Sequence, residues 1–410
     1  MGLEAHYDYT PQVYRRIVFA AAQSVSFQEA ADSLRELADQ TLLSKRVWRA
    51  AKRIGEEHVT ECRAAADRYE ALPLPAQQGT PSPQVPRVAC VQMDGGRFQV
   101  RERVAATSGL AEPKGSTEES SWREYKAGVL LSMTSEVRTE DPCPELPATF
   151  ADPGKMREIS REIKGFTSES PVSISSAETA KPDCKKRAGR PETLVKSVVA
   201  TSGDVHAFGP LLASAAHERG FHAAPRKAFV ADGSATNWGV WRRYFSHYTP
   251  ILDFVHALMY VYAGAMAGRP VDVGWVHYRD WAQWLWSGQV DRLLAALAQR
   301  QQELGLPEKD EEGTPRAQVA ESLNYLTNQR ERMHYAGYRK QGLPLTSSPM
   351  ESTIKQINRR LKGSEKFWDE GANPMLHLVA DRLSQTNMVD KFWSRRLDRL
   401  LHAASYHQSP

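Results

Sequence analysis

Hydrophobic and polar positions alternate along the chain with two different periods, which divide it into helical and strand-forming regions. Between residues 10 and 72, apolar side chains recur at helical spacing, as in SFQEAADSLRELAD (26–39). The segment RVACVQMD (87–94) is instead apolar on both faces, a pattern typical of a strand in the middle of a sheet. Residues 73–86, LPLPAQQGTPSPQV, are rich in proline and predict a linker between the two regions.

After residue 87 the pattern predicts three strands and then alternating helices and strands. The tripeptide DGG (94–96) is a hairpin signal between the strands 87–94 and 97–101, and YKAGVLLSMTSEV (125–137) supplies the third strand. The remaining elements are strands at 226–232 and 248–254 and helices near 204–219, 236–246 and 255–267. This order predicts an α/β fold in which helices flank a mixed five-stranded sheet.

Two further regions are predicted mainly as helix or as loop. Residues 138–194 are rich in proline, serine and charge, and predict an excursion containing the single helix GKMREISREIKGF. Residues 275–341 predict a tryptophan-rich helical insertion, interrupted by the polar loop LPEKDEEGTPR. The segment GLPLTSSP then leads into a helix at 350–363, and the tail to residue 410 is amphipathic and helical.

Composition narrows the class of protein. The chain has 410 residues, of which 41% are hydrophobic and 25% charged, and its net charge of +4 is weak evidence for an anionic partner. The four cysteines show no CxxC zinc spacing and are too few for a disulfide framework. The N-terminus lacks an apolar signal core, and the longest apolar stretch, 254–268, is too short to span a bilayer. We therefore expect a reduced, cytoplasmic protein that does not bind membranes.

A basic helix follows a polar break at Gln40-Thr41, and Ser44 is predicted to cap it. A helix-turn-helix protein would place such a second helix in the DNA major groove. An ordinary surface helix with a solvated basic face explains the pattern equally well. The cations concerned are Lys45, Arg46, Arg49, Lys52 and Arg53.

Three acids far apart in the sequence become important if the fold brings them together. Asp94 ends the first predicted strand, Asp232 ends the fourth, and Glu351 begins a late helix. In a sheet of this order the first and fourth strands can be neighbours. Adjacent carboxylates repel each other unless a cation lies between them, and oxygen ligands suit Mg²⁺ or Mn²⁺. Two such metals activate an attacking oxygen and stabilise a leaving oxygen in phosphoryl transfer.

Each acid also has a simpler structural explanation, which is favoured when the acid is considered alone. Asp94 is the first residue of a Gly-Gly turn, and Asp232 begins an Asp-Gly turn after a strand. Glu351 completes a capping box with Ser348, with Pro349 as the first helical residue.

The order of four segments supports the metal-binding alternative. VQMDGGR, FVADGSATNW, ILDFVHALMYV and TSSPMESTIKQINRRLKGSEKFWDEGANPML together resemble the bacterial insertion-sequence transposases of the DDE, RNase H-like type. The resemblance is to the ISKra/ISLre-like branch, which has a helical insertion before the catalytic glutamate. It covers roughly residues 85–395, with an interruption near 138–194.

The resemblance implies a site and its partners. Asp94, Asp232 and Glu351 would hold two Mg²⁺ or Mn²⁺ ions, and His256 of the DFVH motif, with Asp253, would lie near them. The partners would be double-stranded DNA, as the element's terminal repeats and as target, and further copies of the chain. Cations on the last helix and aromatic residues of the insertion would contact DNA, although a solvated face and a tryptophan core explain them as well. These DNA-contacting candidates are Lys355, Arg359, Lys362, Arg339, Trp281 and Trp284.

The predicted organisation and activity follow from this resemblance. The expected function is metal-dependent cleavage of transposon ends and joining of the freed 3′-hydroxyl to target DNA. The alternatives are a transposase-derived protein that binds DNA without cutting it, and a hydrolase that uses a carboxylate pair. The expected regions are a DNA-binding region (1–72), a linker (73–86), the first part of a catalytic core (87–274), a helical insertion (275–341) and the last core helices with the tail (342–410).

Overall fold

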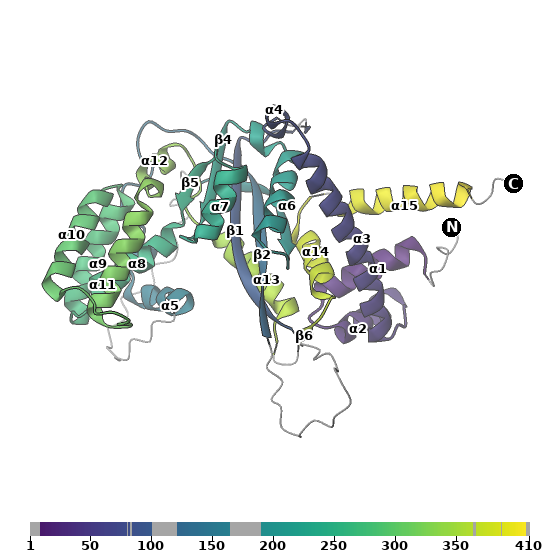
Figure 1. Cartoon of the computed structure of the whole chain (residues 1–410), viewed down its shortest axis with the longest axis horizontal. Coiled ribbons are helices and arrows are strands. Elements are labelled where there is room, and N and C mark those ends of the chain that lie inside the picture. The colour runs from purple at the N-terminus through teal and green to yellow at the C-terminus, as the bar shows by residue number, and fades with distance from the viewer. Residues whose placement is uncertain are drawn as a thin grey trace, which may run out of the picture. The chain divides into compact units, whose positions relative to one another are not determined.

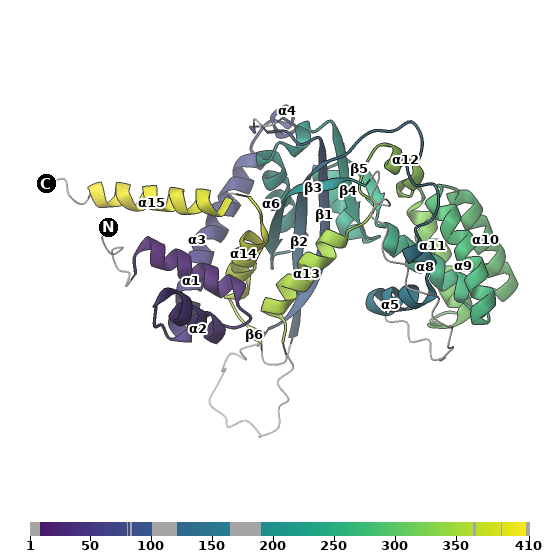
Figure 2. The ribbon, with the colours of Figure 1, turned by 180° about the vertical axis from the view of Figure 1, so that it is seen from behind.

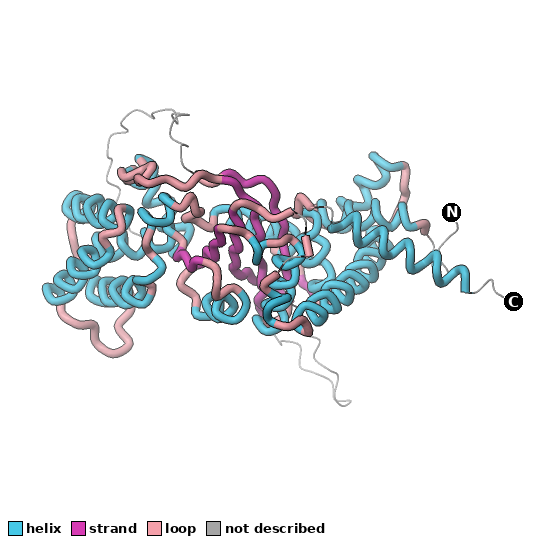
Figure 3. The backbone as a smooth tube through the Cα atoms, turned by 90° about the horizontal axis from the view of Figure 1, so that it is seen from above, coloured by secondary structure: helices cyan, strands magenta, loops and turns pink. Residues whose placement is uncertain are grey.

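The computed structural model has an α/β fold in which helices flank a mixed sheet, as the sequence predicted (Figures 1 and 3). Five strands follow the order β3-β2-β1-β4-β5, and the short strand β6 pairs with β1. The chain forms two compact units, unit 1 (Met1–Ser132, Thr193–Ala224 and Ser348–Pro410) and unit 2 (Met133–Glu192 and Pro225–Ser347). The structure describes residues 9–79, 81–82, 84–100, 121–164, 190–363, 366–386 and 388–406.

Unit 1 contains the N-terminal helices, strands β1 to β3 with β6, and the C-terminal helices. Its helices are α1 (Pro11–Gln23), α2 (Phe27–Ala38), α3 (Ser44–Glu70), α4 (Leu74–Gln77), α6 (Val205–Glu218), η3 (Phe221–Ala223), α13 (Ser348–Leu361), α14 (Ala372–Leu383) and α15 (Met388–Tyr406). Its strands are β1 (Val88–Val100), most of β2 (Ser121–Thr134), most of β3 (Glu192–Thr201) and β6 (Phe367–Trp368).

The long helix α3 lies at the centre of the packing of unit 1. Its apolar stripe, which includes Val47, Ala51 and Ile54, is fully buried against α1, α6 and α14. Burial of such a stripe, more than intrinsic propensity, is what stabilises a helix in a protein. The predicted cap is wrong, because Leu43 is the N-cap residue and Ser44 is already helical.

Helices α6 and α13 cover opposite faces of the strands of unit 1 (Figures 1 and 2). On one face, Gly128 of β2 lies so close to α6 that an added Cβ would be 2.6 Å from Cδ1 of Leu212. On the other face, α13 packs against β1 through a stripe that includes Met350 and Ile357. The sheet of unit 1 is therefore buried on both faces, as the continuous apolar run at 87–94 predicted.

The hairpin predicted at Asp94-Gly95-Gly96 is wrong, because β1 runs unbroken from Val88 to Val100. Gly96 is required there for a packing reason. A Cβ at Gly96 would lie 2.3 Å from the Tyr125 ring of β2, closer than real contacts allow. The two strands predicted at 87–94 and 97–101 are thus one strand, and β3, which was not predicted, is the remaining member of the five.

Unit 2 contains the parallel pair β4 and β5, in which Val230 is paired with Ile251. Its helices α8, α9, α10 and α11 pack on one another. The order of helices and strands matches the prediction. The predicted polar loop (306–316) lies between α10 and α11, except for its last two residues, which begin α11. The elements are η1 (Ala148–Ala151), α5 (Pro153–Lys164), β4 (Arg226–Ala231), α7 (Ala235–Tyr244), β5 (Thr249–Leu252), α8 (Phe254–Met266), α9 (Val271–Trp286), α10 (Val290–Leu304), α11 (Pro315–Asn328), η4 (Arg330–Arg332) and α12 (Tyr335–Lys340).

The border between the units does not coincide with the proline-rich segment 73–86, which lies inside unit 1 together with the N-terminal helices. Helices α1 and α3 pack against α14, which is far from them in the sequence. Residues 165–189 of the excursion predicted at 138–194 lie outside the described residues. No helix among the described residues is both long enough and apolar enough to cross a membrane.

Candidate functional site

Asp94 lies inside β1 and is half-buried. Its Oδ1 accepts a hydrogen bond from the backbone N–H of Gly95 at 2.7 Å. The nearby Tyr125 of β2 is fully buried, and its hydroxyl donates to Oδ1 of Asn358 on α13 at 2.9 Å. Burial, and then the negative charge of Asp94, raise the pKa of Tyr125. Asp94 thus lies close to a tyrosine that joins β2 to α13.

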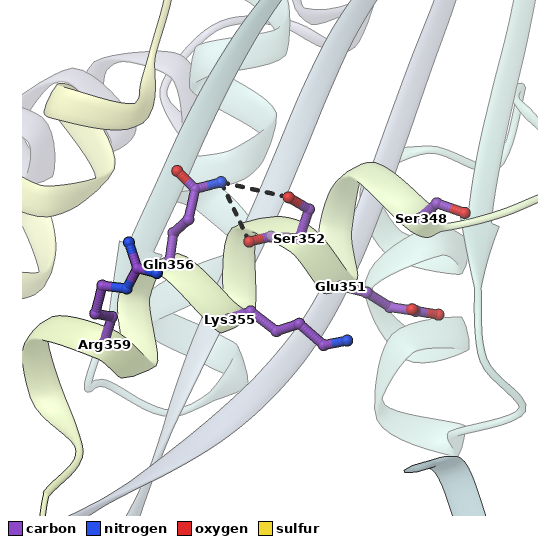
Figure 4. Close-up of a pocket in the computed structure, with 6 residues that line it drawn as sticks. All are labelled: Ser348, Glu351, Ser352, Lys355, Gln356 and Arg359. Atoms are coloured by element: carbon purple, nitrogen blue, oxygen red, sulfur yellow. Dashed lines mark hydrogen bonds between the residues drawn. The ribbon is translucent and has the colours of Figure 1, made fainter. Parts of the chain in front are cut away.

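Helix α13 presents one acid followed by cations on a single face. Glu351 is half-buried in the first turn, and Lys355 and Arg359 follow on the same face at helical spacing. Figure 4 shows the side chains of Glu351 and Lys355 extending in the same direction from neighbouring turns. They line an open cavity of about 400 Å³ together with Ser348, Ser352, Gln356 and Arg359.

The opposite face of α13 is fixed to unit 1. The guanidinium of Arg360 is 4% exposed, and it donates to the carbonyl oxygen of Ala21 at 3.0 Å. It also lies over the ring of Phe27, 4.3 Å from its centroid. Lys362 is exposed, with its Nζ 5.7 Å from the ring centroid of Trp122. The buried face therefore orients the acid-and-cation face toward solvent.

In unit 2, Asp232 directly follows β4 and stabilises the start of α7. Its Oδ1 accepts from the backbone N–H of Ser234 at 3.0 Å and from Nδ2 of Asn237 at 2.7 Å. The adjacent Gly233 donates its N–H to the hydroxyl of Tyr325 at 3.1 Å. A Cβ at Gly233 would lie 2.3 Å from the Tyr325 ring, so only glycine fits this position. The Asp-Gly turn is confirmed, and one carboxylate oxygen of Asp232 is engaged in it.

Asp253 is completely buried at the N-cap of α8. Its Oδ1 accepts from the backbone N–H of His256 at 2.9 Å, and its Oδ2 accepts from Oγ of Ser347 at 2.7 Å and from the Ser347 N–H. Nδ1 of His256 lies 3.2 Å from Oδ1. Burial opposes ionisation, but the hydrogen bonds from His256 and Ser347 outweigh it and lower the pKa of Asp253. Asp253 therefore orients the His256 ring, which is 25% exposed.

Two stacked tyrosines connect the acids of unit 2. The rings of Tyr260 and Tyr325 lie parallel, with centroids 3.6 Å apart. Burial raises the pKa of Tyr260 to about 12, with further contributions from Glu321 and Asp232. Burial also raises the pKa of Tyr325, whose hydroxyl is influenced by both Asp232 and Asp253. The hydrogen bond from the Gly233 N–H to its hydroxyl holds Tyr325 beside the Asp232 turn.

The five cations predicted on α3 fall into two groups. Lys45, Arg46 and Arg49, in the first two turns, are exposed. Lys52 is half-buried and forms an ion pair with Glu370 at 3.1 Å. Arg53 is half-buried, with its guanidinium 4.4 Å from the Tyr14 ring centroid. The preceding helix α2 carries an acidic surface made of Glu29, Asp32 and Glu36.

Lys45, Arg46 and Arg49 are thus the exposed cations of this set. Lys52 and Arg53 are half-buried, and they form ion pairs with Glu370 and Glu57. The acids of α2 are partly balanced by Arg35 on the same helix, which forms ion pairs with Asp32 and Glu36, so α2 adds no positive surface for a phosphate backbone. A DNA contact through this helix pair would therefore use the N-terminal end of α3, which is the end that helix-turn-helix proteins use to read bases.

The aromatic and arginine candidates of the insertion are mostly engaged within unit 2. Trp281 is 3% exposed, and Arg269 lies 5.5 Å from its ring centroid. Arg339 is 6% exposed and forms a bidentate ion pair with Asp141. Trp281 and Arg339 are therefore engaged within unit 2 in this structure, and their contact with DNA stays a prediction. Trp284 is half-buried, and Arg292 lies 4.1 Å from its ring centroid.

The predicted site residues divide between the two units. Asp94 and Glu351 belong to the β1 and α13 layers of unit 1, whereas Asp232 and His256 belong to unit 2. Sequence reasoning missed Tyr125 and Tyr325, which lie beside these acids. The signal available for each was a glycine one or two residues after the acid, since Gly233 and Gly96 are the positions over which the two rings pack.

Comparison with known proteins does not identify the chain. No family model matches its sequence, and no curated protein matches it.

Proposed function

We propose that the chain is a DNA transposase that cleaves the ends of a mobile element and joins the freed 3′-hydroxyl to target DNA. The observation that carries the proposal is the position of three carboxylates. Asp94 lies in the central strand β1, and Asp232 directly follows the strand β4. Glu351 lies in the first turn of α13, which packs on the sheet. Oxygen ligands of this kind suit Mg²⁺ or Mn²⁺.

In this proposal the three acids hold two Mg²⁺ or Mn²⁺ ions, which activate the attacking oxygen and stabilise the leaving one. The half-exposed carboxylates of Asp94 and Glu351 fit this role, because neither is closed off from solvent. His256, oriented by Asp253, positions a neighbouring ligand or a phosphate oxygen. The protein would act in the bacterial cytoplasm on double-stranded DNA, as an assembly of more than one copy.

The cation stripe on α13 supports DNA as the partner. Lys355 and Arg359 follow the acid at intervals of one helical turn, about 5.4 Å, on a face that is open to solvent. Successive phosphates of one DNA strand are spaced on a similar scale, so such a stripe can follow the backbone while Glu351 lies at the reacting phosphate. This charge arrangement favours DNA over the neutral sugar that a carboxylate-pair hydrolase would bind.

A cleavage and joining assay tests the proposal. The full chain is incubated with Mg²⁺ or Mn²⁺ and a donor fragment that carries the DNA flanking its gene. Wild type is compared with Asp232→Asn, Glu351→Gln and the control Glu312→Gln, which alters an exposed carboxylate between α10 and α11. We expect metal-dependent 3′-end cleavage and joining by wild type and the control, with no product from Asp232→Asn or Glu351→Gln.

Two results would overturn the proposal. Equal product from wild type and Asp232→Asn would remove Asp232 from the metal site. Donor DNA that is bound but never cut by wild type would instead establish the alternative, a transposase-derived DNA-binding protein. Circular dichroism of each variant, matched to wild type, shows that a loss of product is not a loss of fold.

The role of α13 is tested separately by salt dependence. Each phosphate contact that is removed should reduce the slope of log affinity against log salt by about 1. We expect this reduction for Lys355→Ala and for Arg359→Ala. Lys309→Ala, which alters an exposed loop residue, should leave the slope unchanged. Equal slopes for all four proteins would exclude α13 from the DNA contact.

A further inference from the structure

Away from these acids, two helices of unit 1 each carry two side chains of the types that commonly form transition-metal sites. His58 and Cys62 lie four residues apart on α3, and His377 and Asp381 lie four residues apart on α14. Residues at this spacing lie on the same face of a helix, one turn apart. Helices α3 and α14 pack directly against each other. Each helix therefore presents a two-residue cluster at their interface.

The helices approach closely enough for the two clusters to meet. A Cβ added at Gly55 of α3 would lie 2.7 Å from Cβ of Pro374 on α14. His58 and His377 each follow this contact by three residues, so both point into the same part of the interface. Their ring centroids lie 5.8 Å apart, and both residues are buried, at 7% and 5% exposed.

The distances between the polar atoms match those of a tetrahedral zinc site. Sγ of Cys62 lies 3.4 Å from Nδ1 of His58. With Zn–S of about 2.3 Å and Zn–N of about 2.0 Å, these two ligand atoms would be about 3.6 Å apart around a tetrahedral ion. One ligand atom from each of His58, Cys62 and His377 lies within 4.8 Å of the others. Movements of about 1 Å by the side chains therefore suffice to close the site around an ion.

The fourth residue supports one of the ligands. Nε2 of His58 lies 2.8 Å from Oδ2 of Asp381, which leaves the other ring nitrogen, Nδ1, toward Cys62. Metal-binding histidines commonly donate their second N–H to a carboxylate, which fixes the orientation of the ring. We propose that His58, Cys62 and His377 bind a zinc ion, and that Asp381 is the residue that positions His58.

The nature of the ligands selects the metal. One thiolate and two imidazoles favour zinc and other transition metals, and they disfavour Mg²⁺ and Mn²⁺, which prefer oxygen. The site is thus chemically distinct from the carboxylates of the proposed transposase. Because the three ligands come from two helices, a bound ion would hold α3 against α14.

The experiment is a zinc titration of the metal-free full chain in competition with a chromogenic chelator. Wild type is compared with Cys62→Ser, with Asp381→Asn and with Cys143→Ser, a control at a half-buried cysteine of unit 2. We expect one tightly bound zinc ion per chain for wild type and Cys143→Ser. Asp381→Asn should weaken binding by about 10- to 100-fold, and Cys62→Ser should remove tight binding.

Cobalt provides an independent measurement. Co²⁺ in the wild-type site should give the visible absorption of a tetrahedral ion and a thiolate-to-metal band, and Cys62→Ser should lose the latter. Absence of zinc uptake by wild type would refute the site, as would equal affinities of wild type and Cys62→Ser. If Cys62→Ser fails to fold by circular dichroism, Asp381→Asn decides, and its unchanged affinity would count against the proposal. None of these results depends on DNA cleavage.

Discussion

Replacement of Asp253 by asparagine tests how the buried carboxylate at the N-cap of α8 is held by its hydrogen bonds. The carboxylate is completely buried, and each of its oxygens accepts a backbone N–H, from His256 on one side and Ser347 on the other. An asparagine amide has one accepting oxygen and one NH₂ group, which only donates. Whichever way the amide is turned, its NH₂ group faces one of those N–H groups, and that N–H loses its acceptor.

The expected cost follows from this geometry. A hydrogen bond to a charged group contributes about 1.5–3 kcal/mol, and a buried donor without an acceptor costs about 1–3 kcal/mol. We therefore expect Asp253→Asn to lower the free energy of unfolding of unit 2 by about 3–5 kcal/mol. With a urea m-value of about 2 kcal/mol per molar, the midpoint should fall by about 1.5–2.5 M.

Urea unfolding followed by tryptophan fluorescence measures this shift, because the insertion of unit 2 is rich in tryptophan. The matched control is Asp280→Asn, the same chemical change at an exposed position of α9, for which we expect a shift within about 0.5 kcal/mol. Equal midpoints for Asp253→Asn and Asp280→Asn would refute the view that Asp253 is held as a buried, ionised cap.

Other predictions concern packing and pH. Gly96→Ala should lower the free energy of unfolding by about 1–3 kcal/mol, because the added Cβ would overlap Tyr125. The control Gly239→Ala, in open space on α7, should be neutral or stabilising. Equal urea midpoints for the two variants would contradict the overlap. Burial opposes ionisation of Asp141, but Arg339 outweighs it and lowers that pKa. The pair should stabilise the fold above the ordinary carboxyl pKa of about 4 and lose this effect as the pH falls through the lowered value. Urea midpoints should therefore fall less on acidification in Asp141→Asn than in wild type, and parallel pH profiles would disprove the coupling.

Periodicity predicted most helices and three strands of the sheet within a few residues, but it misplaced the first hairpin. The residues Asp94, Gly95 and Gly96 have the local chemistry of a turn. In the fold they continue β1, because Gly96 provides the space for the Tyr125 ring. That contact joins residues 29 positions apart, and no local pattern records it. Tertiary packing thus decided between turn and strand where local preference favoured the turn.

Prediction of the candidate site was limited by a similar cause. Sequence patterns indicated Asp94, Asp232 and Glu351 as candidate site residues. They did not show which of the other candidates are buried and paired with residues inside the protein. Arg339 is such a case, since its partner Asp141 lies 198 positions away in the sequence. The residues of the proposed zinc site were not predicted from the sequence for the same reason. Helix α3 contributes two of the four residues and α14 the other two, and no CxxC spacing indicates them. Long-range pairing of this kind becomes visible only in the fold.

The packing of α3 against α14 also has a consequence for how the chain is made. About 300 residues separate the two helices, so at about 5–20 residues per second a ribosome would need about 15–60 s to produce the second after the first. During that interval α1, and later α6, can pack on α3, but the part of its apolar stripe that α14 covers lacks its partner. The synthesis of unit 2 is complete sooner, because its last segment is translated before α13 and α14. Nascent chains stalled before residue 372 should therefore recruit chaperones through α3, and ribosome profiling of chaperone-bound chains would locate that window.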